Sequence, residues 1–142
     1  MALNVDTILH GADALLYLNG VLLENVKACN AKEEYDIAEV TTAGNHDTDH
    51  RFNRRKGSGS ITLHKTNSVL INAMADFQKN NIVPVFTIVS QRPTTDGTKM
   101  ESIQLNNVKF TDLELINFNI DELGETECPF VFKGWKALDT IA

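Results

Sequence analysis

Apolar side chains recur at every second position along most of this chain. The alternation covers residues 29–37, 61–63, 103–105 and 128–132. A period of two is typical of a β-strand with one face buried and one face in solvent. About seven or eight such segments, with turn residues between them, favour a mainly β fold in which antiparallel strands form a sandwich or a barrel.

The strongest local signal is Asn19-Gly20. It lies between the apolar runs 14–18 and 21–23. Asn and Gly both tolerate the positive φ angles of a type I′ turn, so this pattern predicts a β-hairpin near the start of the chain.

One stretch has the helical period instead. Its apolar stripe consists of Leu70, Ala73, Met74 and Phe77. Ser68 is placed to cap the N-terminus, and Asn80-Asn81 with Pro84 ends the pattern. We therefore expect a single helix that flanks the sheet and turns this stripe toward the core.

Two segments interrupt the alternation. Between residues 43 and 58 it stops, which predicts a long extended loop of the kind that is usually functional or mobile. Gly57-Ser58-Gly59, which follows, would be a hinge or the entry to a strand. Between residues 110 and 121 the alternation changes phase, which indicates a bulge or a break between two strands.

Composition limits the function classes. The chain has 142 residues, 42% hydrophobic and 23% charged, which fits one globular domain over residues 1–142. Its net charge of -6 makes it a poor candidate for wrapping DNA, although it could line a passage through which DNA slides. We expect no signal peptide, no membrane binding by the free subunit and reduced Cys29 and Cys128.

Residues with catalytic chemistry are sparse. The sequence has no phosphate-binding glycine motif, no Cys-x-x-Cys and no His-Glu-x-x-His. We therefore expect no enzyme, no catalytic residue, no cofactor and no metal. The one ambiguous motif is His46-Asp47-Thr48-Asp49-His50, whose imidazoles and carboxylates are possible metal ligands but also fit a solvated polar loop. A small metal-dependent enzyme and a monomeric carbohydrate-binding sandwich are the alternatives, the latter weakened by the single tryptophan.

Charge is distributed unevenly. The stretch 43–58 has two more cations than acids, while residues 101–142 have eight acids and three lysines. This pattern fits either ordinary uneven surface charge or a head-to-tail contact between identical subunits. In the second case Arg51, Arg54, Arg55 and Lys56 would meet acidic surface, with Glu122, Glu125 and Glu127 as candidates.

In the order and spacing of its segments the chain resembles the tail tube proteins of contractile-tailed phages, prophages and tail-like bacteriocins of Gram-positive bacteria. The resemblance spans nearly the whole chain. It rests on the Asn19-Gly20 hairpin, the polar loop after Val40, and residues 57–65 (GSGSITLHK), 84–87 (PVFT), 107–110 (NVKF) and 129–132 (PFVF).

This resemblance implies a structural subunit that forms hexameric rings. The rings would stack into a hollow tube inside a contractile sheath, for DNA delivery or membrane puncture. The implied partners are the subunit itself, the tail sheath protein, baseplate and tail terminator proteins, and a tape-measure protein or DNA in the lumen. The implied location is a virion or tail-like particle, assembled in the bacterial host cytoplasm.

In the family the long loop reaches the neighbouring ring. The matching contact residues here are Gly44, His46, Asp47, Asp49, His50, Arg51, Phe52, Arg54, Arg55 and Lys56. We expect the loop to be mobile in the free subunit and ordered in the tube.

Overall fold

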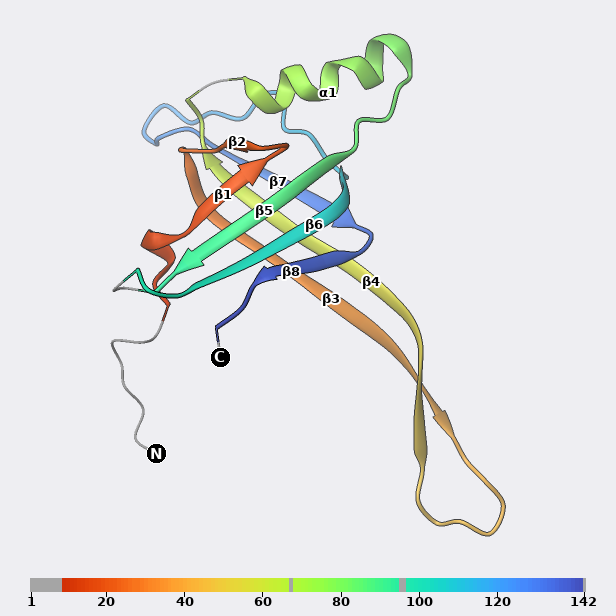
Figure 1. Ribbon diagram of the computed structural model, residues 1–142. Helices are drawn as coiled ribbons and strands as arrows, with labels where there is room; N and C mark the ends of the chain where they lie inside the picture. The colour runs from red at the N-terminus through yellow and green to blue at the C-terminus, as the bar shows by residue number, and fades with distance from the viewer. Residues whose placement is uncertain (1–8, 67, 95–96, 142) are drawn as a thin grey trace.

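The strands follow the period-two segments of the sequence and form an open antiparallel sheet (Figure 1). The computed structural model describes residues 9–66, 68–94 and 97–141. In order along the chain, the elements are a 3₁₀ turn η2 (Gly11–Asp13), β1 (Leu15–Leu18), β2 (Val21–Leu22), β3 (Val26–Val40), β4 (Asp49–His64), α1 (Val69–Asn80), β5 (Phe86–Pro93), β6 (Met100–Phe110), β7 (Glu125–Phe132) and β8 (Trp135–Asp139).

The strands form two layers that cross one another in Figure 1. One layer contains β2, β1, β5, β6 and β8, and the other contains β3, β4 and β7. Strand β6 joins them, because its last residues Lys109 and Phe110 leave the first layer and pair with β7. Asn107 has a φ of 53° just before this switch. Since the sheet does not close, the fold is a sandwich and not a barrel.

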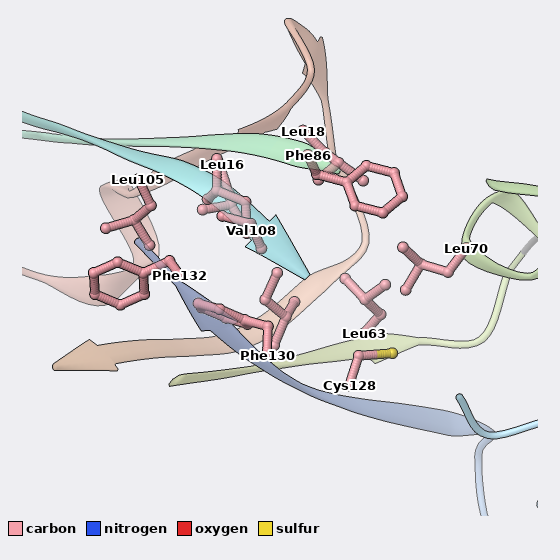
Figure 2. Packing of buried hydrophobic residues seen from close by; sticks show 12 residues of the cluster. Leu16, Leu18, Leu63, Leu70, Phe86, Leu105, Val108, Cys128, Phe130 and Phe132 are labelled. Carbon is pink, nitrogen blue, oxygen red and sulfur yellow. The ribbon is translucent and has the colours of Figure 1, made fainter. Parts of the chain in front are cut away.

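Side chains from both layers fill the space between them (Figure 2). The buried apolar residues are Leu16, Leu18, Ile61, Leu63, Leu70, Phe86, Ile88, Leu105, Val108, Cys128, Phe130 and Phe132. Leu70 comes from α1 and points toward Leu63 and Phe86, so the helix closes one end of the sandwich. Each fully buried side chain of this size stabilises the fold by roughly 1.5–3 kcal/mol relative to an exposed one.

The predicted hairpin is confirmed. Asn19 and Gly20 have φ angles of 51° and 83°, as a type I′ turn requires, and they connect β1 to β2. Asn19 also attaches the turn to β5. Its backbone N–H donates to the carbonyl of Thr87 at 2.8 Å, and its side-chain oxygen accepts from the N–H of Thr87 at 2.8 Å.

The helix also lies where its stripe predicted it. It ends at Asn80, and the following Asn81 has a φ of 56°, the left-handed conformation common after a last helical turn. Two details differ from expectation. Ser68 precedes the helix without a side-chain capping hydrogen bond, and Phe77 is 47% exposed because the stripe extends beyond the edge of the core.

The predicted long loop is largely wrong. Residues 49–58 belong to β4, which pairs with β3 from Val26–Leu63 to Val40–Asp49, so only residues 41–48 form a loop. The outer part of this hairpin, residues 32–56, extends beyond the sandwich as a two-stranded ribbon that we call the arm (Figure 1). Solvent contacts both of its faces, so neither face requires apolar alternation.

Two further sequence interpretations can be compared with the structure. The connection between β6 and β7 contains no strand, so the phase change near residue 115 marks a break between two strands and not a bulge. The turn-forming residues at 92–97 (RPTTDG) predict a loop, and this prediction is partly wrong. Arg92 and Pro93 belong to β5, while Thr95 and Asp96 lie outside the described residues.

The Gly57-Ser58-Gly59 triplet lies within β4 and is not a hinge. A Cβ atom on Gly57 would overlap the ring of Phe132. A Cβ atom on Gly59 would overlap the carbonyl oxygen of Asn30 and the ring of Phe130. These two glycines therefore let two phenylalanine rings and the backbone of β3 approach β4 closely.

We expect Gly59→Ala to lower the free energy of unfolding by about 1–3 kcal/mol, because the backbone of β3 must move to admit the methyl group. Gly11→Ala is the control, since a Cβ atom there meets nothing within 4 Å. Urea unfolding of both variants measures the difference. Equal stability of the two variants would contradict this account of the close approach.

Candidate interaction surfaces

The arm carries every contact residue that the sequence analysis expected in the long loop. Gly44, His46 and Asp47 lie in its tip, and Asp49 and His50 begin β4. The remaining ones follow along β4 as Arg51, Phe52, Arg54, Arg55 and Lys56. Local hydrogen bonds shape the tip: the N–H of Asn45 donates to the carbonyl of Thr42 at 3.2 Å, and the N–H of Asp47 donates to the Asn45 side chain at 3.1 Å.

The cations of the arm face acids from its other strand. Arg54 lies opposite Asp36, and Lys56 lies opposite Glu34. Glu34 is also paired with Lys32 at 3.0 Å, and the hydrogen bond from that ammonium lowers the pKa of the carboxyl. Residues 32–56 thus contain five cations and six acids. The acids of β3 therefore offset the excess positive charge that β4 carries by itself. This offset arises because the two strands pair.

Apolar side chains are also exposed on the arm. Tyr35, Ile37, Val40 and Phe52 are each between 43% and 65% exposed. The rings of Tyr35 and Phe52 meet edge to face with centroids 5.5 Å apart. Alternation had placed Tyr35 and Ile37 on a buried face, but at this distance from the sandwich no core covers them. Exposed aromatic residues among mixed charges are typical of protein–protein contact surfaces.

The three candidate acidic residues lie at the other end of β4. Glu125 and Glu127 are opposite His64 and Thr62, six or more residues from Lys56, which is at least roughly 20 Å along the strand. Glu125 pairs with Lys27 at 2.5 Å, and this hydrogen bond lowers the pKa of its carboxyl. Glu122 is exposed in the connection before β7. Within one chain, therefore, Glu125 and Glu127 lie beyond contact with the cations of the arm.

A groove lies where the arm leaves the sandwich. It has a volume of about 830 Å³ and opens between the base of the arm and the turn from β7 to β8. Hydrogen bonds from Asn106 N–H to the Gly134 carbonyl and from Lys133 N–H to the Asn106 carbonyl, both at 3.0 Å, hold this turn beside β6. Its side-chain lining includes Glu33, Phe52, Arg54, Arg55, Phe132, Lys133 and Trp135.

Three groove residues, Phe52, Arg54 and Arg55, are among the contact residues expected from the sequence. Phe132 was expected only as part of the alternation over 128–132, and Trp135 had no expected role. Trp135 is 49% exposed, whereas Phe132 is buried over Gly57. No local sequence pattern signals the groove, because it forms between segments that are about eighty residues apart.

The possible metal ligands do not converge. Asp49 and His50 lie opposite Val40 and Glu39 on the arm, and His46 and Asp47 are in its tip. Across the described residues, no three His, Cys, Asp or Glu side chains form a group that could hold a metal ion. The geometry therefore gives the metal-site alternative no support.

Two other structural findings concern the cysteines and membranes. Cys29 and Cys128 are both free, and Ile61 lies between them in register on β4. Two strand spacings separate them by about 9–10 Å, which is too far for a disulfide. In the described part of the chain no helix is long and apolar enough to span a membrane.

Comparisons with known proteins agree on one kind of protein. A family model described as "Phage tail tube protein" matches residues 1–139. Among curated proteins, the phage-like element PBSX protein XkdM of Bacillus subtilis (strain 168) is 28% identical over 144 residues, which covers 100% of this chain and 98% of XkdM. The uncharacterized protein YqbM of the same strain is 28% identical over 135 residues, covering 94% and 92%.

Two solved structures have the same fold. A chain of the PVC sheath-tube complex, an extracellular contractile injection system in its extended state, superposes with a TM-score of 0.78 at 11% identity, covering 96% of this chain and 95% of that one. A chain of the anti-feeding prophage cap superposes with a TM-score of 0.77 at 10% identity, covering 99% and 95%. At such low identity the likeness concerns the fold alone.

The pairing of β4 predicts a gradient of stability along the hairpin. Residues 57–64 pair with β3 and β7, whereas residues 49–56 pair with β3 only. An isolated two-stranded ribbon is marginally stable in water, so in the free subunit amides of 49–56 should exchange faster than those of 57–64. Hydrogen exchange followed by mass spectrometry measures this. Equal protection along β4 would contradict the prediction.

Proposed function

Because this chain belongs to the phage tail tube protein family, and is thus a structural subunit of a tail tube, we propose that it forms hexameric rings that stack into a hollow tube inside a contractile sheath. The tube would deliver DNA or help to puncture a membrane. This role requires contacts between copies and needs no catalytic group or cofactor.

The observation that carries the proposal is the arm. Its inner end is held in the sandwich, but residues 34–40 and 49–56 pair only with each other and expose aromatic and charged side chains. A ribbon of this length buries little apolar surface within its own chain. The conformational entropy lost on ordering it is therefore larger than the free energy that burial in a lone subunit returns. Contact with a neighbouring copy would supply the missing burial.

We assign the contact between stacked rings to Gly44, His46, Asp47, Asp49, His50, Arg51, Phe52, Arg54, Arg55 and Lys56. Of the three candidate acids, Glu125 already pairs with Lys27 in its own chain. Glu122 and Glu127 are therefore the better partners for the arm of a neighbour. Because β3 offsets much of the positive charge, this contact is a set of individual ion pairs rather than attraction between oppositely charged bodies.

The similar proteins suggest the remaining partners. One solved neighbour is a chain of a sheath-tube complex, others are chains of a tube-terminating cap and a baseplate, and XkdM is a protein of a phage-like element. By analogy we propose that this subunit contacts a tail sheath protein, a baseplate and a terminator, and encloses a tape-measure protein or DNA. It would assemble in the host cytoplasm into a virion or tail-like particle.

The purified chain should form rings or tubes as its concentration rises, because each copy carries both halves of a repeating contact. Negative-stain microscopy and analytical sedimentation test this, with tail baseplates added to nucleate growth. A chain that stays monomeric at high concentration and with baseplates present would overturn the proposed function.

The double variant Arg54→Gln, Arg55→Gln tests the contribution of the ion pairs. Exposed pairs contribute roughly 0.2–1 kcal/mol each, so we expect the critical concentration for assembly to rise about fivefold, or about 1 kcal/mol per subunit. Added salt should weaken assembly of the original chain, because exposed charges are screened beyond about 8–10 Å. Replacement by glutamate is less informative, since it places a carboxylate opposite Asp36 and destabilises the arm itself.

Lys79→Gln, Lys136→Gln is the matched control. It removes two exposed cations that lie outside the arm. If the two double variants assemble equally well and salt has no effect, the electrostatic contact is wrong, although the tube function stands.

A further inference from the structure

The connection between β6 and β7 exposes more apolar surface than a lone subunit should. Leu115, Ile116, Phe118, Ile120 and Leu123 are between 68% and 94% exposed, and all lie within residues 112–123, which we call the apolar segment. Exposed apolar groups gathered so closely along one surface segment mark a site that another molecule covers. Figure 1 shows the connection at the end of the molecule where α1 lies.

The apolar segment is fixed to the sandwich and is not a loose loop. At one end, the N–H of Thr111 donates to the Pro129 carbonyl at 3.0 Å. At the other end, the N–H of Lys65 donates to the Gly124 carbonyl at 2.8 Å. Between them, the carboxylate of Glu114 accepts from the N–H of Glu127 at 2.9 Å and from the Asn117 side chain at 2.9 Å. The segment therefore presents its apolar side chains on a defined backbone.

Charge indicates what kind of surface covers this segment. Residues 112–123 contain four acids, Asp112, Glu114, Asp121 and Glu122, and no Lys or Arg. An anionic lipid surface or another acidic surface would be repelled. The complementary site is apolar and cationic.

The groove at the base of the arm has these properties. Its side chains include three cations, Arg54, Arg55 and Lys133, against one acid, Glu33. Two aromatic rings border it with exposed surface, Phe52 at 65% and Trp135 at 49%. Arginine and aromatic residues are enriched where protein partners bind, and they contribute most of the binding energy there.

The apolar segment cannot reach the groove of its own chain. Glu114 is attached at Glu127, five residues along β7 from Phe132, which is roughly 16 Å. From there the chain continues away from the groove to Gly124, which lies beside Lys65 at the far end of β4. The two surfaces are therefore available only to other molecules.

We propose that the apolar segment of one copy docks in the groove of a second copy. The inference rests on the proposed function, and it adds which surfaces meet and what chemistry joins them. Because segment and groove are different surfaces of one chain, the contact is heterologous: every copy that binds leaves a free groove and a free segment. Such a contact repeats and so builds a ring or a stack, which a self-complementary patch would not do.

Crosslinking in the assembled particle tests the pairing directly. With p-benzoylphenylalanine in place of Phe118, and an equal mixture of isotope-labelled and unlabelled chains, irradiation should join this position to residues 52–57 or 132–135 of another copy. Crosslinks to other regions would overturn the inference, as would crosslinks that form only when a sheath protein is added. If no particle forms from the unmodified chain, the proposed function itself fails.

A second variant gives an independent readout. Phe118→Ser, Ile120→Ser should raise the critical concentration at least tenfold without changing the unfolding midpoint, since both side chains are at least 80% exposed. Trp135 is the only tryptophan, so its fluorescence should shift to the blue as the groove fills in the original chain. Ile82→Ser, Val83→Ser is the control, because it removes exposed apolar surface outside both sites. Unchanged assembly of the segment variant would overturn the inference.

Discussion

The structure depends on the pairing of β4. This strand has a paired neighbour on both sides along half of its length and on one side along the rest. From Gly57 to His64 it lies between β3 and β7, with its glycines beneath the rings of Phe130 and Phe132. From Asp49 to Lys56 it has only β3 as a partner. The inner half anchors the outer half, so the same strand contributes to the core and to the projecting arm.

The arm and the edge of the sheet have to avoid unwanted pairing before assembly. Strand β3 ends the sheet, and along the arm it carries Lys32, Glu33, Glu34 and Asp36. Charged side chains on an edge strand oppose indiscriminate strand addition. The mixed charges that make the arm nearly neutral thus have a second effect, since they protect an edge that a purely apolar ribbon would expose to aggregation.

A tube subunit must not aggregate while it is free, yet it must bind other copies during assembly. The distribution of its apolar surface fits both requirements. The groove and the apolar segment each combine exposed apolar groups with charge, positive in one and negative in the other. In the contact that we propose, like-charged segments of two free copies would repel, whereas a segment and a groove would attract.

Local patterns were enough to predict the hairpin at Asn19-Gly20, the helix that ends at Asn80, and the strands around Ile61, Leu105 and Phe130, because each depends on residues a few positions apart. The sequence also singled out the residues of the arm that we propose as contacts, although as members of a loop, and their contact role stays a prediction. Strand pairing decided the rest. It placed Asp36 opposite Arg54, set Trp135 and Phe52 on the same groove, and left Phe118 and Ile120 outside the core. Whether an alternating apolar residue is buried depends on what packs against it, and that neighbour comes from a distant part of the chain.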